Sequence, residues 1–312
     1  MRNYIVKRTL MVLFITLGVT FIVFTIMNII PGDPGRLILG MNAAAEDVAG
    51  LNHELGVDRP FFIRYISYIT NALQGDFGLS YHSRRPVVEN IKTAFPYTIT
   101  LAVLGVAVAY LLGIPIGIVS AIRRYSAVDI GSTLGAMFFA SIPQFWLALL
   151  LMLLFSLKLG WLPPSGVQGL RNFIMPVITM ALPIMAIISR LTRTSMLDCL
   201  KQDYIRTVRA QGAPESVVIW RHALKNALLP IIITLIITFG SALGGTVIIE
   251  NIFSIPGMGN LILTAIRQKD DPVVLTATIM LSVMYCLFML VGDLLMAYLD
   301  PRIRQVYLRK NR

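Results

Sequence analysis

Residue types that carry out covalent catalysis are sparse in this sequence and do not form a recognised set. The chain of 312 residues has three histidines, His53, His82 and His222, and two cysteines. It lacks the phosphate-loop spacing G-x-x-x-x-G-K-[ST], the zinc-hydrolase spacing H-E-x-x-H and the serine-hydrolase turn G-x-S-x-G. No His/Cys/Asp cluster indicates a metal path. The sequence therefore predicts no catalytic residue, no metal site and no cofactor or ATP bound by this chain.

Ionisable residues deep in a bilayer would indicate a secondary carrier or a channel. Outside the end region near Arg190, the first four apolar stretches contain none, and Glu250 and Asp293 lie close to the ends of theirs. A carrier or channel remains the alternative from a different class, and an intramembrane hydrolase, which would need a nucleophile and a base at membrane depth, is a third. If the chain moves a solute, we expect the energy to come from another subunit.

The elements that position the remaining residues are predicted to be membrane-spanning helices. Hydrophobic residues make up 56% of the chain and charged residues 14%, and the mean hydropathy is +0.74. A span needs about 20 apolar residues in succession. Six stretches meet this requirement: Thr9–Ile30, Tyr97–Ala121, Ile130–Leu157, Phe173–Ser195, Leu228–Ile249 and Val273–Leu299. The fold class predicted is an all-α integral membrane protein with six transmembrane helices.

The basic residues predict the orientation of these spans. Of the 27 Lys and Arg residues, 17 fall before the first span, at 123–124 after the second, from Arg190 to Lys225, and after Pro301. Because positive charge accumulates on the inner side, we expect both termini to be cytoplasmic. The net charge of +11 is then a mark of membrane orientation, and no nucleic-acid partner is predicted.

The segment from Pro31 to Pro96 reads as a small extracytoplasmic cap between the first two spans. Its residue pattern predicts an amphipathic helix at 60–73, followed by glycine-rich loop sequence. We expect six apolar residues of that helix to form one packing stripe: Phe61, Phe62, Tyr65, Ile66, Ile69 and Leu73.

The longest cytoplasmic connection, 196–229, reads as two helices broken at Gly212. Glycine can adopt the left-handed conformation that ends a helix, Pro214 suits the first turn of the next helix, and Glu215 favours its positive end. Val217, Trp220, Leu224 and Leu228 are predicted to share its apolar face. Physical chemistry leaves two interpretations open, a contact with a soluble motor and an interfacial helix on lipid head groups.

Two segments resemble those of a known family. Tyr204 to Pro230, with R-T-V-R-A-Q-G followed by W-R-H-A-L-K-N-A-L-L-P, is similar to the coupling loop of binding-protein-dependent ABC permeases of the dipeptide/oligopeptide/nickel branch. Arg206, Thr207 and Val208 replace the Glu-Ala-Ala of the general pattern, as is usual in this branch. The segment E-N-I-F-S-I-P-G-M-G at 250–259 resembles the one before the family's last outer loop.

The resemblance implies an importer in a bacterial cytoplasmic membrane, surrounded by membrane lipid. In it, this chain would pair with a second homologous permease and with two ATPase subunits that bind ATP and Mg. An extracytoplasmic substrate-binding protein would deliver the substrate. It implies residues 1–93 as first helix plus cap and 94–312 as permease core. Its coupling residues would be Arg206, Thr207, Arg209, Ala210, Gly212, Ala213, Pro214 and Glu215.

The resemblance also implies a pathway between the two permeases. Candidate lining or gating residues are Pro143, Gly240, Gly245 and Glu250, with a solvated carboxylate at the helix end as the alternative for Glu250. The implied substrate is a dipeptide or oligopeptide, with nickel chelates, glutathione or opines as alternatives.

Overall fold

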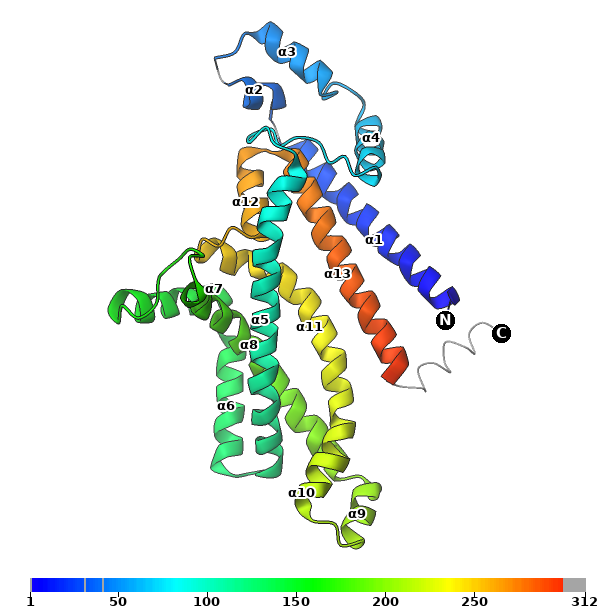
Figure 1. The fold of residues 1–312 in the computed structure, drawn as a ribbon, viewed down its shortest axis with the longest axis vertical. Coiled ribbons are helices and arrows are strands. Elements are labelled where there is room, and N and C mark those ends of the chain that lie inside the picture. The colour runs from blue at the N-terminus through cyan, green and yellow to red at the C-terminus, as the bar shows by residue number, and fades with distance from the viewer. Residues whose placement is uncertain (1, 31, 41, 300–312) are drawn as a thin grey trace. The chain divides into compact units, whose positions relative to one another are not determined.

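The structure is a computed structural model that describes residues 2–30, 32–40 and 42–299. Within these ranges the chain is helical, with one isolated β-bridge between Leu79 and Pro86 (Figure 1). The helices are α1 (Arg2–Ile29), α2 (Pro34–Leu39), α3 (Ala45–Glu54), α4 (Phe61–Leu73), α5 (Val87–Ile122), α6 (Ala127–Ser141), α7 (Gln144–Leu151), π-helical η1 (Met152–Lys158), α8 (Leu170–Leu200), α9 (Asp203–Ala210), α10 (Glu215–Val217), π-helical η2 (Val218–Ala223), α11 (Leu224–Ile252), α12 (Met258–Gln268) and α13 (Asp271–Leu299).

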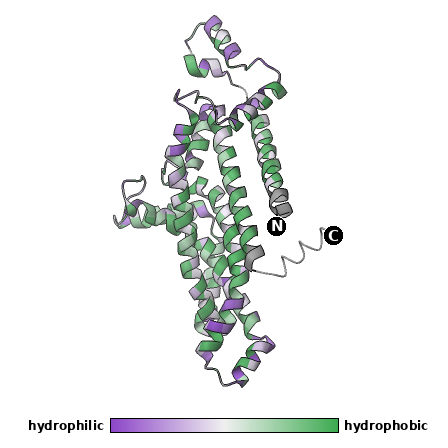
Figure 2. Cartoon of the chain, turned by 45° about the vertical axis from the view of Figure 1, so that its right-hand side comes forward, coloured by the Kyte–Doolittle hydropathy of each residue, from purple (hydrophilic) through white to green (hydrophobic). Residues whose placement is uncertain are grey.

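The prediction of an all-α membrane protein is confirmed. Among the described residues, five helices are long and apolar enough to span a membrane, and a bent pair, α6 with α7 and η1, makes a sixth if it counts as one span. That pair bends by 102° at a break that contains Pro143. Figure 2 shows apolar residues along the long helices and polar residues concentrated in the segments between them. The cytoplasmic position of the termini stays a prediction, and the basic tail after Pro301 lies outside the described residues.

The chain forms two compact units, Met1–Thr98 with Pro256–Leu287, and Ile99–Ile255 with Phe288–Arg312. In the first unit, buried residues of α1, α5, α12 and α13 share one apolar core that includes Met27, Ile91 and Met258. The Thr98 hydroxyl accepts a 2.7 Å hydrogen bond from the Met258 N–H.

Helix α5 begins at Val87, ten residues before the predicted start of the second span at Tyr97. With 36 residues this helix is about 54 Å long, well beyond the roughly 30 Å of the hydrocarbon core. Its first turns are not lipid-facing, since Val87 and Ile91 are buried against protein. Burial in protein extends the helix where hydropathy alone had ended it. Pro31, the first residue of the predicted cap, lies outside the described residues.

Helix α4 confirms the amphipathic helix of the cap, and part of its predicted apolar stripe packs against α1. Phe61 and Tyr65 make edge-to-face contacts with Phe21 and Phe24 of α1. Phe62, Ile66 and Leu73 are exposed instead. The face that packs is thus centred on the aromatic residues, because offset ring contacts add to burial.

In the second unit, α8 packs against α6, α7 and α11. Glycines allow α5 to approach α8 closely: a Cβ at Gly117 would lie 2.5 Å from the Ser189 carbonyl oxygen, and one at Gly113 would lie 3.1 Å from that of Met185. Small residues at this spacing let two backbones meet where larger side chains would hold them apart.

Candidate functional site

The connection between α9 and α10 is a tight turn centred on Gly212. This residue has φ +81°, so it adopts the left-handed conformation predicted for it, and nothing lies within 4 Å of where its Cβ would be. Pro214 is the N-cap of α10 rather than a residue of its first turn, and Glu215 opens the helix. The chain therefore reverses over a few residues and presents the turn outward.

An ion pair closes this turn. The Arg209 guanidinium donates through Nε to Glu215 Oε1 at 2.6 Å and through Nη2 to Oε2 at 3.2 Å. The carboxylate raises the pKa of Arg209, so the guanidinium stays charged. Both side chains are more than a third exposed, and pairs of this kind contribute at most about 1 kcal/mol. Its two parallel hydrogen bonds fix geometry more than they add stability.

Most of the predicted coupling residues share one exposed surface above a buried base. Arg206, Thr207, Arg209, Ala210, Gly212, Pro214 and Glu215 are exposed, and Ala213 is half-buried. Beneath them, Ile205 and Val218 are fully buried in a core with Ile118 of α5 and Met196 of α8. The surface is thus anchored to the ends of two long helices.

The predicted apolar face after the turn is partly wrong. Trp220 is 60% exposed, and the fully buried residues are Val218, Ala223 and Ala227. The reason is that Val218–Ala223 is π-helical, with hydrogen bonds to the fifth residue, so each residue turns by a smaller angle than in an α-helix. The α-helical spacing used for the prediction does not hold across this segment.

Near the coupling surface lies a buried charge cluster that the sequence did not indicate. The Asp129 carboxylate, at the start of α6, accepts hydrogen bonds from Arg193 Nε at 2.5 Å, Arg193 Nη2 at 2.8 Å, Ser120 Oγ at 2.5 Å and the Tyr125 N–H at 2.9 Å. Asp129 is only 3% exposed. The cluster joins α5, α6 and α8, and Arg193 lies 64 residues from Asp129 along the chain, so no local pattern could have found it.

The four candidate pathway residues differ in burial, and their role in a pathway stays a prediction. Pro143 is exposed at the break between α6 and α7, Gly240 is buried in α11, and Gly245 is half-buried with nothing within 4 Å of its Cβ position. Glu250 is fully buried, so the solvated carboxylate proposed as its alternative is wrong. Among the described residues, no group of three or more His, Cys, Asp or Glu side chains lies close enough together to hold a metal ion.

Comparison with known proteins decides the family. Residues 113–305 match the model of the binding-protein-dependent transport system inner membrane component, and residues 1–102 match its N-terminal companion. The chain belongs to this family. It is therefore a multi-pass permease subunit of an ABC importer in a bacterial inner membrane, and it is not an enzyme of its own.

Relatives support the assignment over almost the whole permease. It is 39% identical over 305 residues to the glutathione transport system permease protein GsiC of Salmonella typhimurium (strain LT2), covering 97% of this chain and 99% of that protein. The protein of that name from Escherichia coli (strain K12) is 38% identical over 304 residues.

Solved structures share the fold. The MetNI methionine ABC transporter has a TM-score of 0.58 at 17% identity, over 69% of the permease and 98% of that chain. An amino acid ABC transporter solved with histidines has a TM-score of 0.55 at 15% identity, and the match covers 68% of this permease and 94% of that chain.

Proposed function

We propose that this permease imports short peptides and is driven by ATPase subunits that dock on the α9–α10 turn. In the proposed complex it pairs with a second permease and two ATPases, which hold ATP and Mg, and receives substrate from an extracytoplasmic binding protein. The observation that carries the coupling role is the exposed turn at Gly212, closed by the Arg209–Glu215 pair over a buried base.

The mechanism follows from how that base is built. Ile205 and Val218 lie in the same core as the ends of α5 and α8, so a push on the turn moves packed side chains rather than a loose loop. Close-packed interiors transmit displacement because they contain few voids. ATP binding would close the ATPases and shift the turn, and the paired bundles would open outward; hydrolysis would reset them.

The peptide substrate rests on the sequence relatives. The name of the relatives at 38–39% identity specifies glutathione, which is a tripeptide, over nearly the full length of both chains. Dipeptides, oligopeptides and glutathione belong to one class of substrate, the short peptides proposed here. Nickel chelates and opines are the alternative substrates that a transport assay would distinguish from them.

A pair of matched glycine variants tests the coupling role. Gly212 and Gly160 both have positive φ and no atom within 4 Å of the Cβ position. Valine at either position incurs the same kind of backbone strain, at least about 1–2 kcal/mol. In reconstituted vesicles containing the whole importer, we expect Gly212→Val to reduce peptide-stimulated ATP hydrolysis at least fivefold, whereas Gly160→Val leaves it near wild type.

Two results would contradict these assignments separately. Equal ATPase rates in the two variants, with normal assembly, would remove the α9–α10 turn from the coupling role. Uptake of a labelled nickel chelate or opine but of no peptide by the wild-type vesicles would overturn the substrate class and leave the coupling role intact.

A further inference from the structure

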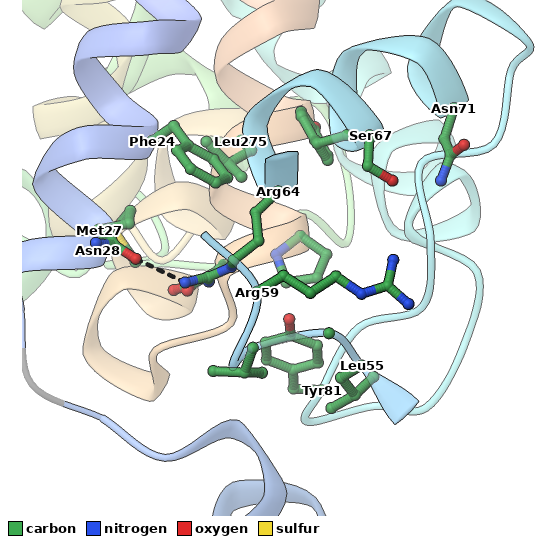
Figure 3. Close-up of a pocket in the computed structure, with 15 residues that line it drawn as sticks. Phe24, Met27, Asn28, Leu55, Arg59, Arg64, Ser67, Asn71, Tyr81 and Leu275 are labelled. Atoms are coloured by element: carbon green, nitrogen blue, oxygen red, sulfur yellow. Dashed lines mark hydrogen bonds between the residues drawn. The ribbon is translucent and has the colours of Figure 1, made fainter. Parts of the chain in front are cut away.

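A cavity of about 190 Å³ lies in the first compact unit, on the side predicted to be extracytoplasmic. Its walls come from α1, α4, the segment before α4, Tyr81 and the start of α13 (Figure 3). Phe24, Met27 and Leu275 supply apolar surface, while Arg59, Arg64 and Asp271 supply charge. A second cavity of about 190 Å³ shares Asn28, Arg64 and Asp271. The charged residues thus lie where the two cavities meet.

Asp271 is the acidic group of this cavity and lacks a hydrogen-bond partner among the described residues. It is half-buried in the first turn of α13, and no described residue donates a hydrogen bond to its carboxylate or forms an ion pair with it. The adjacent Asp270 differs, because its carboxylate accepts the Ser80 hydroxyl and the N–H groups of Tyr81 and His82, the latter two at 3.1 and 3.3 Å. Arg64 and Lys269 attract this carboxylate without a hydrogen bond to it, so an ammonium group in the cavity would supply the direct contact that neither makes.

The arginines supply the opposite charge. Arg64 donates through Nη1 to Asn28 Oδ1 at 2.8 Å, and that is its one side-chain acceptor among the described residues, although a guanidinium has five N–H donors. Figure 3 shows the Arg64 guanidinium directed to Asn28 and that of Arg59 extending the opposite way. Planar guanidinium groups bind carboxylates through two parallel hydrogen bonds.

Neutral hydroxyls complete the lining. Burial raises the pKa of Tyr68 to about 12, and burial with the nearby Asp271 carboxylate raises that of Tyr81. Both phenols therefore keep their protons and can donate hydrogen bonds. Pockets that enclose a whole drug-sized ligand are about 300–1,000 Å³, so a cavity of about 190 Å³ suits a smaller molecule such as an amino acid or a dipeptide.

We propose that this cavity binds a zwitterionic amino acid or a dipeptide with free termini, with the ammonium group at Asp271 and the carboxylate at Arg59. The inference rests on the proposed peptide import and assigns a recognition site to this subunit. An anion would match the arginines and leave Asp271 unpaired; a cation would do the reverse. A molecule that carries both charges satisfies both.

The test is photo-crosslinking in vesicles that contain the complete importer. The probe is a dipeptide with a benzophenone side chain and free termini, and mass spectrometry maps the labelled segment. We expect label within residues 55–81 or 271–275. Unmodified dipeptide should compete at least tenfold better than the same dipeptide with an acetylated amino terminus or an amidated carboxyl terminus.

Variants separate binding from folding. We expect Asp271→Asn to reduce labelling at least fivefold, and Asp58→Asn, an exposed cap carboxylate paired with His53, to leave it unchanged. If the Asp271 variant fails to assemble, the exposed Arg59→Gln decides, with an expected threefold loss of labelling.

Two results overturn the site and leave peptide import standing. One is wild-type labelling in Asp271→Asn, or in Arg59→Gln where that variant decides. The other is equal competition by the acetylated or amidated dipeptide and the unmodified one. Vesicles that import no peptide would instead refute the proposed function, whatever the labelling.

Discussion

Replacing Asp129 by asparagine should destabilise the second compact unit far more than a surface change would. The carboxylate is 3% exposed and accepts four hydrogen bonds, two of them from Arg193. Asparagine keeps the size but not the charge, and its amide N–H groups would face donors. Arg193 would then be left as a partly buried guanidinium without its counter-ion.

The magnitude follows from this burial. Removing one partner of a buried ion pair costs about 3–5 kcal/mol. The Arg193 side chain is 26% exposed, so water relieves part of the cost and the lower end, about 3 kcal/mol, is expected. With an unfolding entropy of about 2.1 cal/mol/K per residue, a chain of this length loses on the order of 1.5 °C in Tm per kcal/mol. The expected decrease is therefore roughly 5 °C.

The assay is thermal unfolding of the purified importer complex in detergent, followed by intrinsic fluorescence. Asp198→Asn is the matched control, because Asp198 is an exposed carboxylate on the same helix as Arg193, and it should change stability by less than about 0.5 kcal/mol. Arg193→Gln and the double variant complete a thermodynamic cycle. The double variant should lose less than the sum of the single losses, since no charge is left uncompensated. A Tm for Asp129→Asn within 1 °C of wild type, or strictly additive losses, would refute the reasoning.

Three further changes test other contacts. Gly117→Ala should destabilise the complex by about 1–3 kcal/mol, because its Cβ would meet the α8 backbone. Gly131→Ala is the control and should not change stability, because nothing lies within 4 Å of its Cβ position. Equal Tm values for the two variants would contradict the close approach of α5 to α8. Tyr68→Phe should lower the free energy of unfolding by about 1 kcal/mol, because it removes the 3.1 Å hydrogen bond to the Thr276 hydroxyl. An unchanged Tm would show that this hydrogen bond contributes nothing. The side-chain amide of Asn52 donates to Asp33 and holds the pKa of this carboxyl below its usual range. The hydrogen bonds that begin α2 are therefore present above that range and are lost as pH falls through the lowered pKa. The backbone N–H groups of residues 35–36 should lose protection against hydrogen exchange there, and protection that does not change with pH would argue against the contact.

The sequence predicted those features that depend on local chemistry. Apolar length predicted the spans because lipid cannot satisfy backbone polar groups, and the turn at Gly212 followed from the conformational freedom of glycine. The start of α5 was missed because burial of Val87 in protein, and not lipid, extends the helix. Trp220 was placed on the wrong face because hydropathy does not reveal a π-helical segment.

The two charge clusters were missed for a different reason, which also explains their value. Arg64 and Asp271 are separated by 207 residues, and Arg193 and Asp129 by 64, so only the folded chain brings them together. In a chain with 14% charged residues, most charge lies in the segments between spans, where water stabilises it. Arg193 and Asp129 satisfy each other and tie three helices together beside the coupling turn. Asp271 is attracted by Arg64 and Lys269 but accepts no hydrogen bond from a described residue, so an ammonium group in the cavity would add a direct contact. One cluster is therefore suited to stability and the other to binding.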